Sequence, residues 1–238
     1  MSGVSKAKLR SVTSTVKPFF CILAFSTALL ADPLGDVYAR MDKTAQTFKS
    51  MTADIKQTVH TAVVNDNSLE NGTIKLKRAK PGDTKILVNF TDPDPKTSSI
   101  DGREVRIYLP KSNVVQVIDI GKNRAAVDQA MLLGFGATSA EIRQAYEVTF
   151  VGAEPINNQP ASHIKLIPKS KEVLQQLKQA ELWISDALGC PLQQKLTTSA
   201  AGDYTMFTYS NIKLNASLDD KELRLNPKKG AQIQQVGK

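Results

Sequence analysis

Residues 72–78 read Gly-Thr-Ile-Lys-Leu-Lys-Arg, and this short stretch carries the pattern that decides the fold. Ile74 and Leu76 alternate with Lys75 and Lys77. Successive side chains of a β-strand point to opposite faces, so this strand has one apolar and one basic face. The pattern predicts a half-buried strand of an antiparallel sheet, with its apolar face against the interior.

The same two-residue period extends on both sides of this stretch. Strands are predicted at about 51–60, 72–77, 86–90, 105–109 and 114–120, separated by turns rich in Pro, Gly, Asn and Asp. Short connections between consecutive strands are typical of an antiparallel meander. With the helix that precedes them, these strands supply the apolar residues expected to line the interior: Phe48, Ile55, Ile74, Leu76, Ile86, Val88, Phe90 and Ile107.

Other regions have the three- to four-residue period of helices. One apolar stripe runs from Leu34 to Phe48, and two further helices are predicted at 123–133 and 140–146. The two middle helices are separated by an apolar cluster that contains two glycines. We expect this cluster to form a lid over the interior that moves about Gly134 and Gly136, with the apolar side chains of Met131, Leu132, Leu133 and Phe135.

After the lid the strand period returns near 148–150, 164–166, 182–184 and 206–214, and a short closing strand is predicted at 223–230. No repeat of 20 to 50 residues and no long linker interrupts the chain, which argues against solenoids and propellers. The sequence therefore predicts one mainly β domain with a few helices, from residue 32 to residue 238.

The first 31 residues have the layout of a secretory signal peptide. Lys6, Lys8, Arg10 and Lys17 precede an apolar run from 19 to 31 that ends in small residues, and cleavage is expected after Ala28 or Ala31. This run is shorter than the roughly 18 residues that a membrane-spanning helix needs, although an uncleaved anchor is the alternative. Its removal lowers the formal net charge from +8 to +4, because it carries four basic residues and no acidic one.

Composition and motifs exclude several classes of function. A net charge of +4 without a cluster of basic residues does not indicate binding to nucleic acid. Only His60 and His163 are available as histidines, both within predicted strands, and Cys190 is the single cysteine after residue 31. The chain has no nucleophile elbow, no zinc-binding helix motif and no paired Cys-x-x-Cys. We therefore expect no enzyme activity, no catalytic residue, no metal and no cofactor.

Arg78 stands at the end of the strand predicted from residues 72–78. Alternation places it on the same side as Ile74 and Leu76, where a desolvated guanidinium needs hydrogen-bond acceptors. We expect backbone carbonyls of a covering helix or loop to supply them, so that Arg78 acts as a latch for the lid. An arginine that snorkels to solvent at the rim is the alternative.

The order of these features resembles the LolA-type periplasmic lipoprotein carriers. The resemblance covers about residues 34 to 232 and depends on several short motifs in sequence. These are Lys77-Arg78 followed by Pro81, Asp101-Gly102-x-x-Val105-x-Ile107-Tyr108-x-Pro110, Ile164-Lys-Leu166-Ile-Pro168-Lys169 and Leu225-Asn-Pro227-Lys-Lys-Gly230. The resemblance implies an incomplete antiparallel β-barrel, or half-barrel, covered by a helical lid. It also places Arg78 where that family has an arginine in contact with the lid.

The same resemblance implies a function and partners. The expected function is a monomeric periplasmic carrier that binds the acyl chains of lipoproteins and carries them from the inner to the outer membrane. The implied partners are an inner-membrane lipoprotein-releasing transporter and an outer-membrane receptor. Two alternatives stay open, namely a carrier of another lipid and a periplasmic lipoprotein-sensing regulatory domain.

Overall fold

A computed structural model describes residues 1–3, 32–80, 83–121, 132–198 and 201–236. The chain divides into a short unit, Met1–Ala31, and a compact unit, Asp32–Lys238, which contains every strand and helix named below. The predicted signal peptide, most of the predicted helix at 123–133, and Met131 lie outside the described residues.

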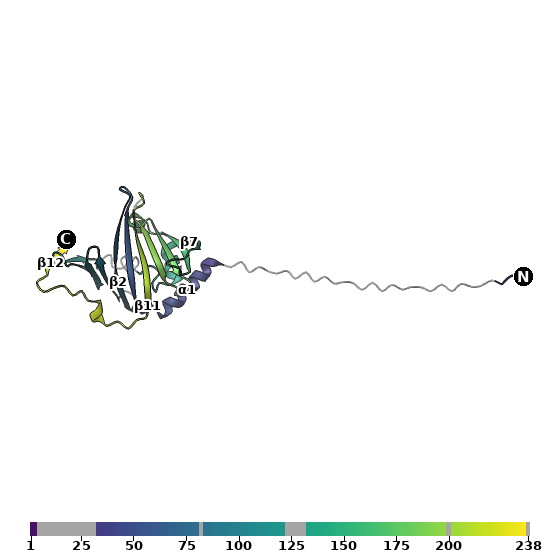
Figure 1. The fold of residues 1–238 in the computed structure, drawn as a ribbon, viewed down its shortest axis with the longest axis horizontal. Coiled ribbons are helices and arrows are strands. Elements are labelled where there is room, and N and C mark those ends of the chain that lie inside the picture. The colour runs from purple at the N-terminus through teal and green to yellow at the C-terminus, as the bar shows by residue number, and fades with distance from the viewer. Residues whose placement is uncertain (4–31, 81–82, 122–131, 199–200, 237–238) are drawn as a thin grey trace. The chain divides into compact units, whose positions relative to one another are not determined.

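Among the described residues, twelve strands form one sheet in the order β12-β6-β5-β4-β3-β2-β1-β11-β10-β9-β8-β7 (Figure 1). All neighbours are antiparallel except β12 and β6, and β12 and β7 remain as two separate edges. The predicted mainly β, incomplete antiparallel barrel is confirmed. The strands are β1 Ser50–Thr61, β2 Asp66–Lys80, β3 Asp83–Asp92, β4 Lys96–Asp101, β5 Glu104–Leu109, β6 Val114–Asp119, β7 Tyr146–Ala153, β8 Ala161–Pro168, β9 Gln179–Ser185, β10 Pro191–Thr197, β11 Tyr204–Leu214 and β12 Gln232–Val236.

The first half of the sheet is the predicted meander, but with six strands instead of five. β4 was missed because its sequence, Lys-Thr-Ser-Ser-Ile-Asp, has almost no apolar alternation. Antiparallel pairing with β3 and β5 holds this polar strand in place. β10 was missed for a similar reason, since Gln193, Gln194 and Lys195 dominate its centre.

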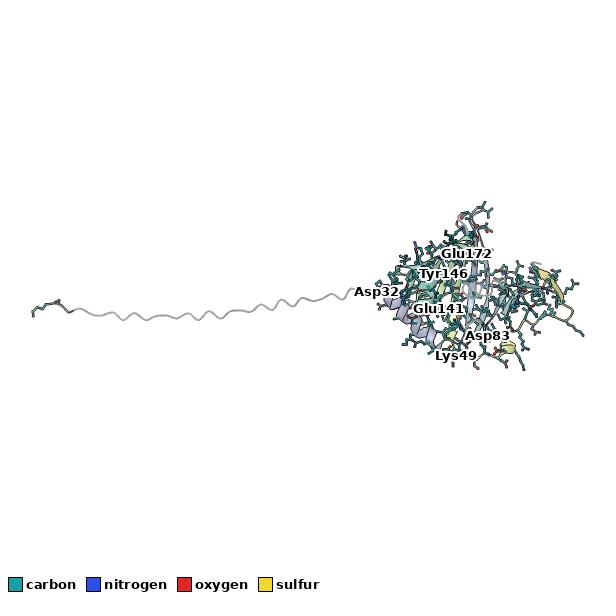
Figure 2. All side chains as sticks on the ribbon, turned by 180° about the vertical axis from the view of Figure 1, so that it is seen from behind. Asp32, Lys49, Asp83, Glu141, Tyr146 and Glu172 are labelled. Atoms are coloured by element: carbon teal, nitrogen blue, oxygen red, sulfur yellow. The ribbon has the colours of Figure 1, made fainter. Side chains whose placement is uncertain are left out.

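The helices are α1 Pro33–Thr47, α3 Ser139–Ala145 and α4 Lys171–Gln176, with a 3₁₀ turn, η2, at Asp220–Leu223. α1 confirms the predicted first helix, and Figure 2 shows it beginning beside Asp32 and ending near Lys49. α3 confirms the predicted helix at 140–146. Thr138 and Glu141 form a reciprocal capping box at its start, which satisfies two backbone N–H groups.

Two apolar clusters share the inner face of the sheet. The first cluster lies on β1–β4 and β11 and includes Met51, Leu76 and Ile86. The second cluster lies on β7–β9, where Val37 and Met41 of α1 and Ile142 of α3 pack against the sheet. The helices therefore cover one half of the inner face, and Leu132 and Phe135, which precede α3, pack on the other half.

The prediction of a strand at 223–230 is wrong. Leu223 ends η2, and the last strand is β12, which pairs in parallel with β6. Residues 215–231, here called the strap, instead cross the outer face of the sheet from β11 to β12. Leu223 is buried, and Leu225 packs against an outer-face cluster around Tyr108. The apolar residues at this position thus mark contacts of an irregular segment, not alternation in a strand.

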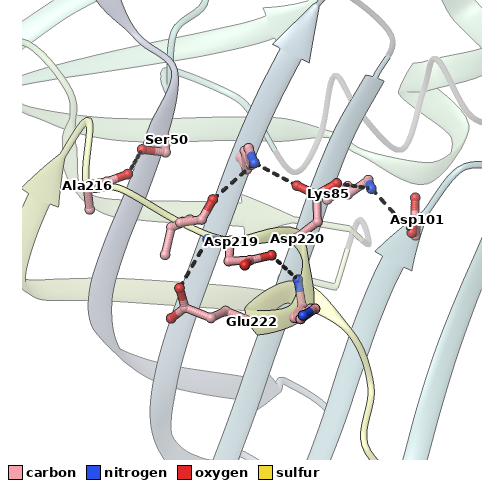
Figure 3. A network of polar contacts seen from close by, with 10 residues as sticks. Ser50, Lys85, Asp101, Ala216, Asp219, Asp220 and Glu222 are labelled. Carbon is pink, nitrogen blue, oxygen red and sulfur yellow. Dashed lines mark hydrogen bonds and ion pairs between the residues drawn. The ribbon is translucent and has the colours of Figure 1, made fainter.

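Ion pairs fasten the strap to the basic face of β2 and β3 (Figure 3). Lys75 contacts Glu222 at 2.8 Å, and Lys77 and Lys85 contact Asp220 at 2.6 and 2.8 Å. Hydrogen bonds from Lys77 and Lys85, reinforced by their charges, lower the pKa of Asp220 to about 2. The basic face predicted from residues 72–78 is therefore the docking surface of the strap.

Protonation of the Asp220 carboxylate is expected to lower the stability of the fold in acid. Because the pKa of Asp220 is lowered on folding, its contribution is complete above the ordinary value of 3.8 and is lost as the pH falls through about 2. We expect Asp220→Asn to lower the urea midpoint of unfolding at neutral pH, with a difference from wild type that begins to shrink near pH 3.8 and vanishes below about pH 2. The exposed Glu147→Gln on β7 is the control. A difference that persisted unchanged at the lowest pH would contradict the assignment.

Candidate binding site

An unbroken apolar row crosses the inner face of the sheet. Consecutive cross-strand partners from β11 through β1 to β6 are Leu214, Met51, Leu76, Ile86, Ile100, Val105 and Ile118. Six steps of about 4.8 Å between strands make this row about 29 Å long. The row is continuous because the register of the sheet brings one apolar side chain of each strand to the same level. The row forms the floor of the candidate site.

Most residues predicted to line the interior lie together in the first cluster. It brings together Phe48, Ile55, Ile74, Leu76, Ile86, Val88 and Phe90 with Leu132 and Phe135 of the predicted lid. Ile107 is half-buried and lies two residues beyond Val105 on β5, on the same face. Leu133 packs in the second cluster instead, beside the helices. Met131 lies outside the described residues.

Residues 132–136, here called the lid segment, pack on the inner face, where Leu132 and Phe135 join the first cluster. Phe135 is 1% exposed, and its ring meets that of Tyr209 edge-on at 5.0 Å between centroids. Gly134 and Gly136 both have positive φ, and a Cβ on Gly136 would lie 2.5 Å from the Phe48 ring. Only glycine combines this conformation with so close an approach. Leu132 and Phe135 of the lid segment thus occupy part of the apolar interior in the described part of the chain.

Arg78 attaches the lid segment from the β2 side. Its Nη1 donates a hydrogen bond to the Gly136 carbonyl at 2.6 Å, and its backbone N–H donates to the carbonyl of Lys49. The guanidinium lies against Gly136, since a Cβ there would be 2.9 Å from Nη1. The structure therefore places Arg78 against a backbone carbonyl of the covering segment, the arrangement expected from sequence.

A second attachment, which the sequence did not predict, comes from β10 and β11. Gln194 Nε2 donates to the Leu133 carbonyl, and the Tyr209 hydroxyl donates to Gln194 Oε1 at 2.7 Å. Both side chains are buried, and burial raises the pKa of Tyr209, which keeps its proton. The inward position of Gln194 follows from the register of the folded sheet, so the sequence alone offered no signal that identifies it.

A third attachment joins the helices that frame the lid segment. Asp42 of α1 accepts hydrogen bonds from the backbone N–H and the hydroxyl of Ser139, at 2.6 and 2.7 Å. Ser139 is the first residue of α3 and is buried. A carboxylate at the start of a helix also interacts favourably with the helix dipole. This contact fixes the end of the lid segment that continues into α3.

A pocket of about 240 Å³ opens at the end of α1, beside the turn between β9 and β10. Phe48, Leu188 and Leu214 line it, and all three also belong to the first cluster or pack against it. Arg40 and Lys43 also line it. The pocket therefore lies at the edge of the apolar interior and shares Phe48 with the first cluster.

The described residues give little support for metal binding or for catalysis by a histidine or cysteine. No three His, Cys, Asp or Glu side chains among them gather in a way that could hold a metal ion. His163 stacks on Trp183 at 4.1 Å and contacts Glu181 at 3.1 Å on the outer face. Burial raises the pKa of the Cys190 thiol to about 12, so it is not a reactive thiolate. None of the described helices is long and apolar enough to span a bilayer.

An open, largely antiparallel sheet with an apolar inner face and a covering segment defines the class of this fold as a carrier-like half-barrel. The chain belongs to the LolA family, described as outer membrane lipoprotein carrier protein LolA, and residues 46–225 match that family. The resemblance predicted from the sequence is confirmed. A search of curated protein sequences finds no match.

Solved structures share the fold at low sequence identity. An uncharacterised conserved protein from Thermus thermophilus is 14% identical, with a TM-score of 0.52 over 85% of this chain and 98% of that chain. MucB is 13% identical, with a TM-score of 0.50, and the match covers 81% of this chain but only 62% of MucB. Mycobacterium tuberculosis lipoprotein LppX is 14% identical, with a TM-score of 0.47 over 79% of this chain and 100% of that chain.

Proposed function

We propose that this chain is a periplasmic carrier that binds the acyl chains of lipoproteins between the apolar row and the lid segment. The observation that carries the proposal is the row itself, seven strands wide and covered by a segment attached through a few hydrogen bonds. Loading replaces Leu132 and Phe135 with cargo. Membership of the LolA family supports the same substrate class.

Energetics give a reason for a latched lid over the site. Burial of acyl CH₂ groups contributes about 0.8 kcal/mol each. Complete burial of several long chains would exceed roughly 20 kcal/mol, which is near the ceiling of reversible affinity. A carrier must release its cargo, so it has to set binding against an internal cost. Displacement of the lid segment and its attachments at Arg78, Gln194 and Asp42 supplies that cost.

The proposed pathway starts at an inner-membrane lipoprotein-releasing transporter and ends at an outer-membrane receptor. The carrier acts as a monomer, and nucleic acid has no part in it. The pocket beside Phe48 is the proposed entrance, because it lies at the edge of the apolar interior and shares Phe48 with the first cluster. The test is mass spectrometry of the chain purified from its native envelope. Bound lipoprotein or lipid supports the proposal, and a ligand-free chain that also fails to bind an apolar dye contradicts it.

The compartment gives a separate prediction about the mature N-terminus. The basic residues and the apolar run from 19 to 31 indicate export, so the exported protein is expected to begin at Leu29 or Asp32. Intact-mass measurement of the envelope fraction checks this. Finding Met1 on the exported protein would show that the segment is not cleaved.

A lipoprotein-sensing regulatory domain is the second candidate function. MucB, which has a similar fold, is solved in complex with MucA, so a protein of this fold can bind a protein partner, and the match covers 62% of MucB. Both candidates bind acyl chains in the same place and differ in the fate of the cargo. A carrier transfers its cargo to acceptor membranes or a receptor, whereas a sensor retains it and changes its affinity for a regulatory partner.

A further inference from the structure

The lid segment is attached at Gln194 by a polar side chain that lies in apolar surroundings. Gln194 is 2% exposed and faces the interior between Phe207 on β11 and Leu182 on β9. Its side chain lies at the boundary of the two apolar clusters, to which these neighbours belong. Tyr209, which is 4% exposed, is its polar partner from the sheet. A buried amide in an apolar chamber needs an acceptor for its N–H groups.

Hydrogen bonds on two sides set which way that amide points. The Tyr209 hydroxyl donates to Gln194 Oε1, and Nε2 donates to the Leu133 carbonyl. A flipped amide would bring its oxygen against the Leu133 carbonyl oxygen, which can only accept, and would lose that hydrogen bond, while the Tyr209 hydroxyl could turn and accept from Nε2. Burial raises the pKa of Tyr209, so the phenol keeps the proton that it donates to Oε1. The pair therefore presents a preoriented N–H donor to the interior.

Cargo that displaces the lid segment takes the Leu133 carbonyl away from this donor. Leaving a buried donor unsatisfied is unfavourable, and a plain hydrocarbon has no acceptor to offer. An acyl chain differs from an alkyl chain by one group, the carbonyl of its ester or amide. That group is the same kind of acceptor as the backbone carbonyl that it would replace.

We infer that Gln194, oriented by Tyr209, binds the carbonyl oxygen of the acyl ester or amide of the ligand and so selects acyl over alkyl chains. The inference depends on the proposed function and adds a polar specificity site to an otherwise apolar chamber. With its carbonyl at Gln194, a chain can extend past Phe207 along the first cluster. The space that it occupies is the one now filled by Phe135.

The test compares two probes of equal chain length on the full mature chain. One is a fluorescent peptide with an ester-linked diacylglyceryl cysteine, and the other is its ether-linked dialkylglyceryl counterpart. Wild type is expected to bind the ester probe roughly three- to tenfold more tightly, the ratio that a neutral hydrogen bond supplies. Gln194→Met should abolish this preference. Lid effects cancel in the ratio, since both probes must displace the same segment.

Gln193→Met is the matched control, because Gln193 is adjacent on β10 but faces outward and accepts a hydrogen bond from Thr208. It should keep the preference for the ester. Tyr209→Phe retains the ring against Phe135 but frees the amide to turn, so it should weaken the preference for the ester. If Gln194→Met does not fold, the result with Tyr209→Phe tests the inference instead. The inference is overturned if wild type binds both probes equally, or if the Gln194 and Tyr209 variants keep the preference for the ester. Either result leaves the proposed function standing. Failure of wild type to bind either probe overturns the proposed function as well.

Discussion

Arg78→Leu is expected to accept cargo normally and to release it about ten- to a hundredfold more slowly than wild type. Arg78 Nη1 donates to the Gly136 carbonyl at 2.6 Å in the closed state, and a hydrogen bond from a charged group contributes roughly 1.5–3 kcal/mol. Cargo has to break this bond to displace the lid segment, so the bond lowers net affinity. Its removal, with the added apolar surface of leucine, stabilises the loaded state.

The measurement is the dissociation rate of an acylated peptide, followed beside a transfer assay to acceptor membranes. Lys75→Leu is the control, because Lys75 is on the outer face of the same strand and contacts Glu222 of the strap. It should change neither rate. If Arg78→Leu releases cargo as fast as wild type, or unfolds, then Arg78 is a structural residue at the rim and not a latch.

The part of the fold that could be predicted from sequence is the part governed by local alternation. Ile74, Leu76, Ile86 and Val88 are buried together because a sheet with one buried face requires a two-residue period. β4 has no such period, and its position depends on pairing with strands on both sides. Local patterns contain no information about such pairing, and this is why a meander of six strands was predicted as five.

The C-terminal region was predicted wrongly for a different reason. Leu223 and Leu225 have the spacing of a strand, but they are anchors of the strap on the outer face. The true strand, β12, reads Gln-Ile-Gln-Gln-Val and buries none of its five side chains. It is held to β6 by backbone pairing, so its sequence shows no burial pattern that could be recognised.

The candidate site was predicted where it is apolar and missed where it is polar. Arg78 could be placed because the pairing of β2 with β3 is regular from Gly72 to Arg78. Gln194 could not, because the pairing of β10 is irregular between Pro191 and Gln193. Leu192 consequently packs with Trp183 on the outer face, which hides the inward position of Gln194 from simple alternation. The register that reveals this position is a property of the folded sheet.

Leu132→Asp is expected to abolish binding of an apolar dye or acylated peptide while leaving the sheet folded. Leu132 is 8% exposed and packs in the first cluster, whereas the strands beneath it keep their own pairing without it. Covering cargo would force the new carboxylate into an apolar space without a partner. The lost burial of leucine and the cost of desolvating the charge together exceed about 3 kcal/mol, or about a hundredfold in affinity.

Ala140→Asp tests whether the position or only the added charge matters. Ala140 follows the lid segment in the chain and is exposed on α3. A carboxylate there stays in water and lies in the first turn of a helix, where negative charge is favourable. Dye titration and circular dichroism of both variants should therefore show binding lost only in Leu132→Asp, with strand content unchanged in both. Undiminished dye binding by a folded Leu132→Asp would mean that ligands enter without contact to the lid segment, and the cover would have to be sought elsewhere on the inner face.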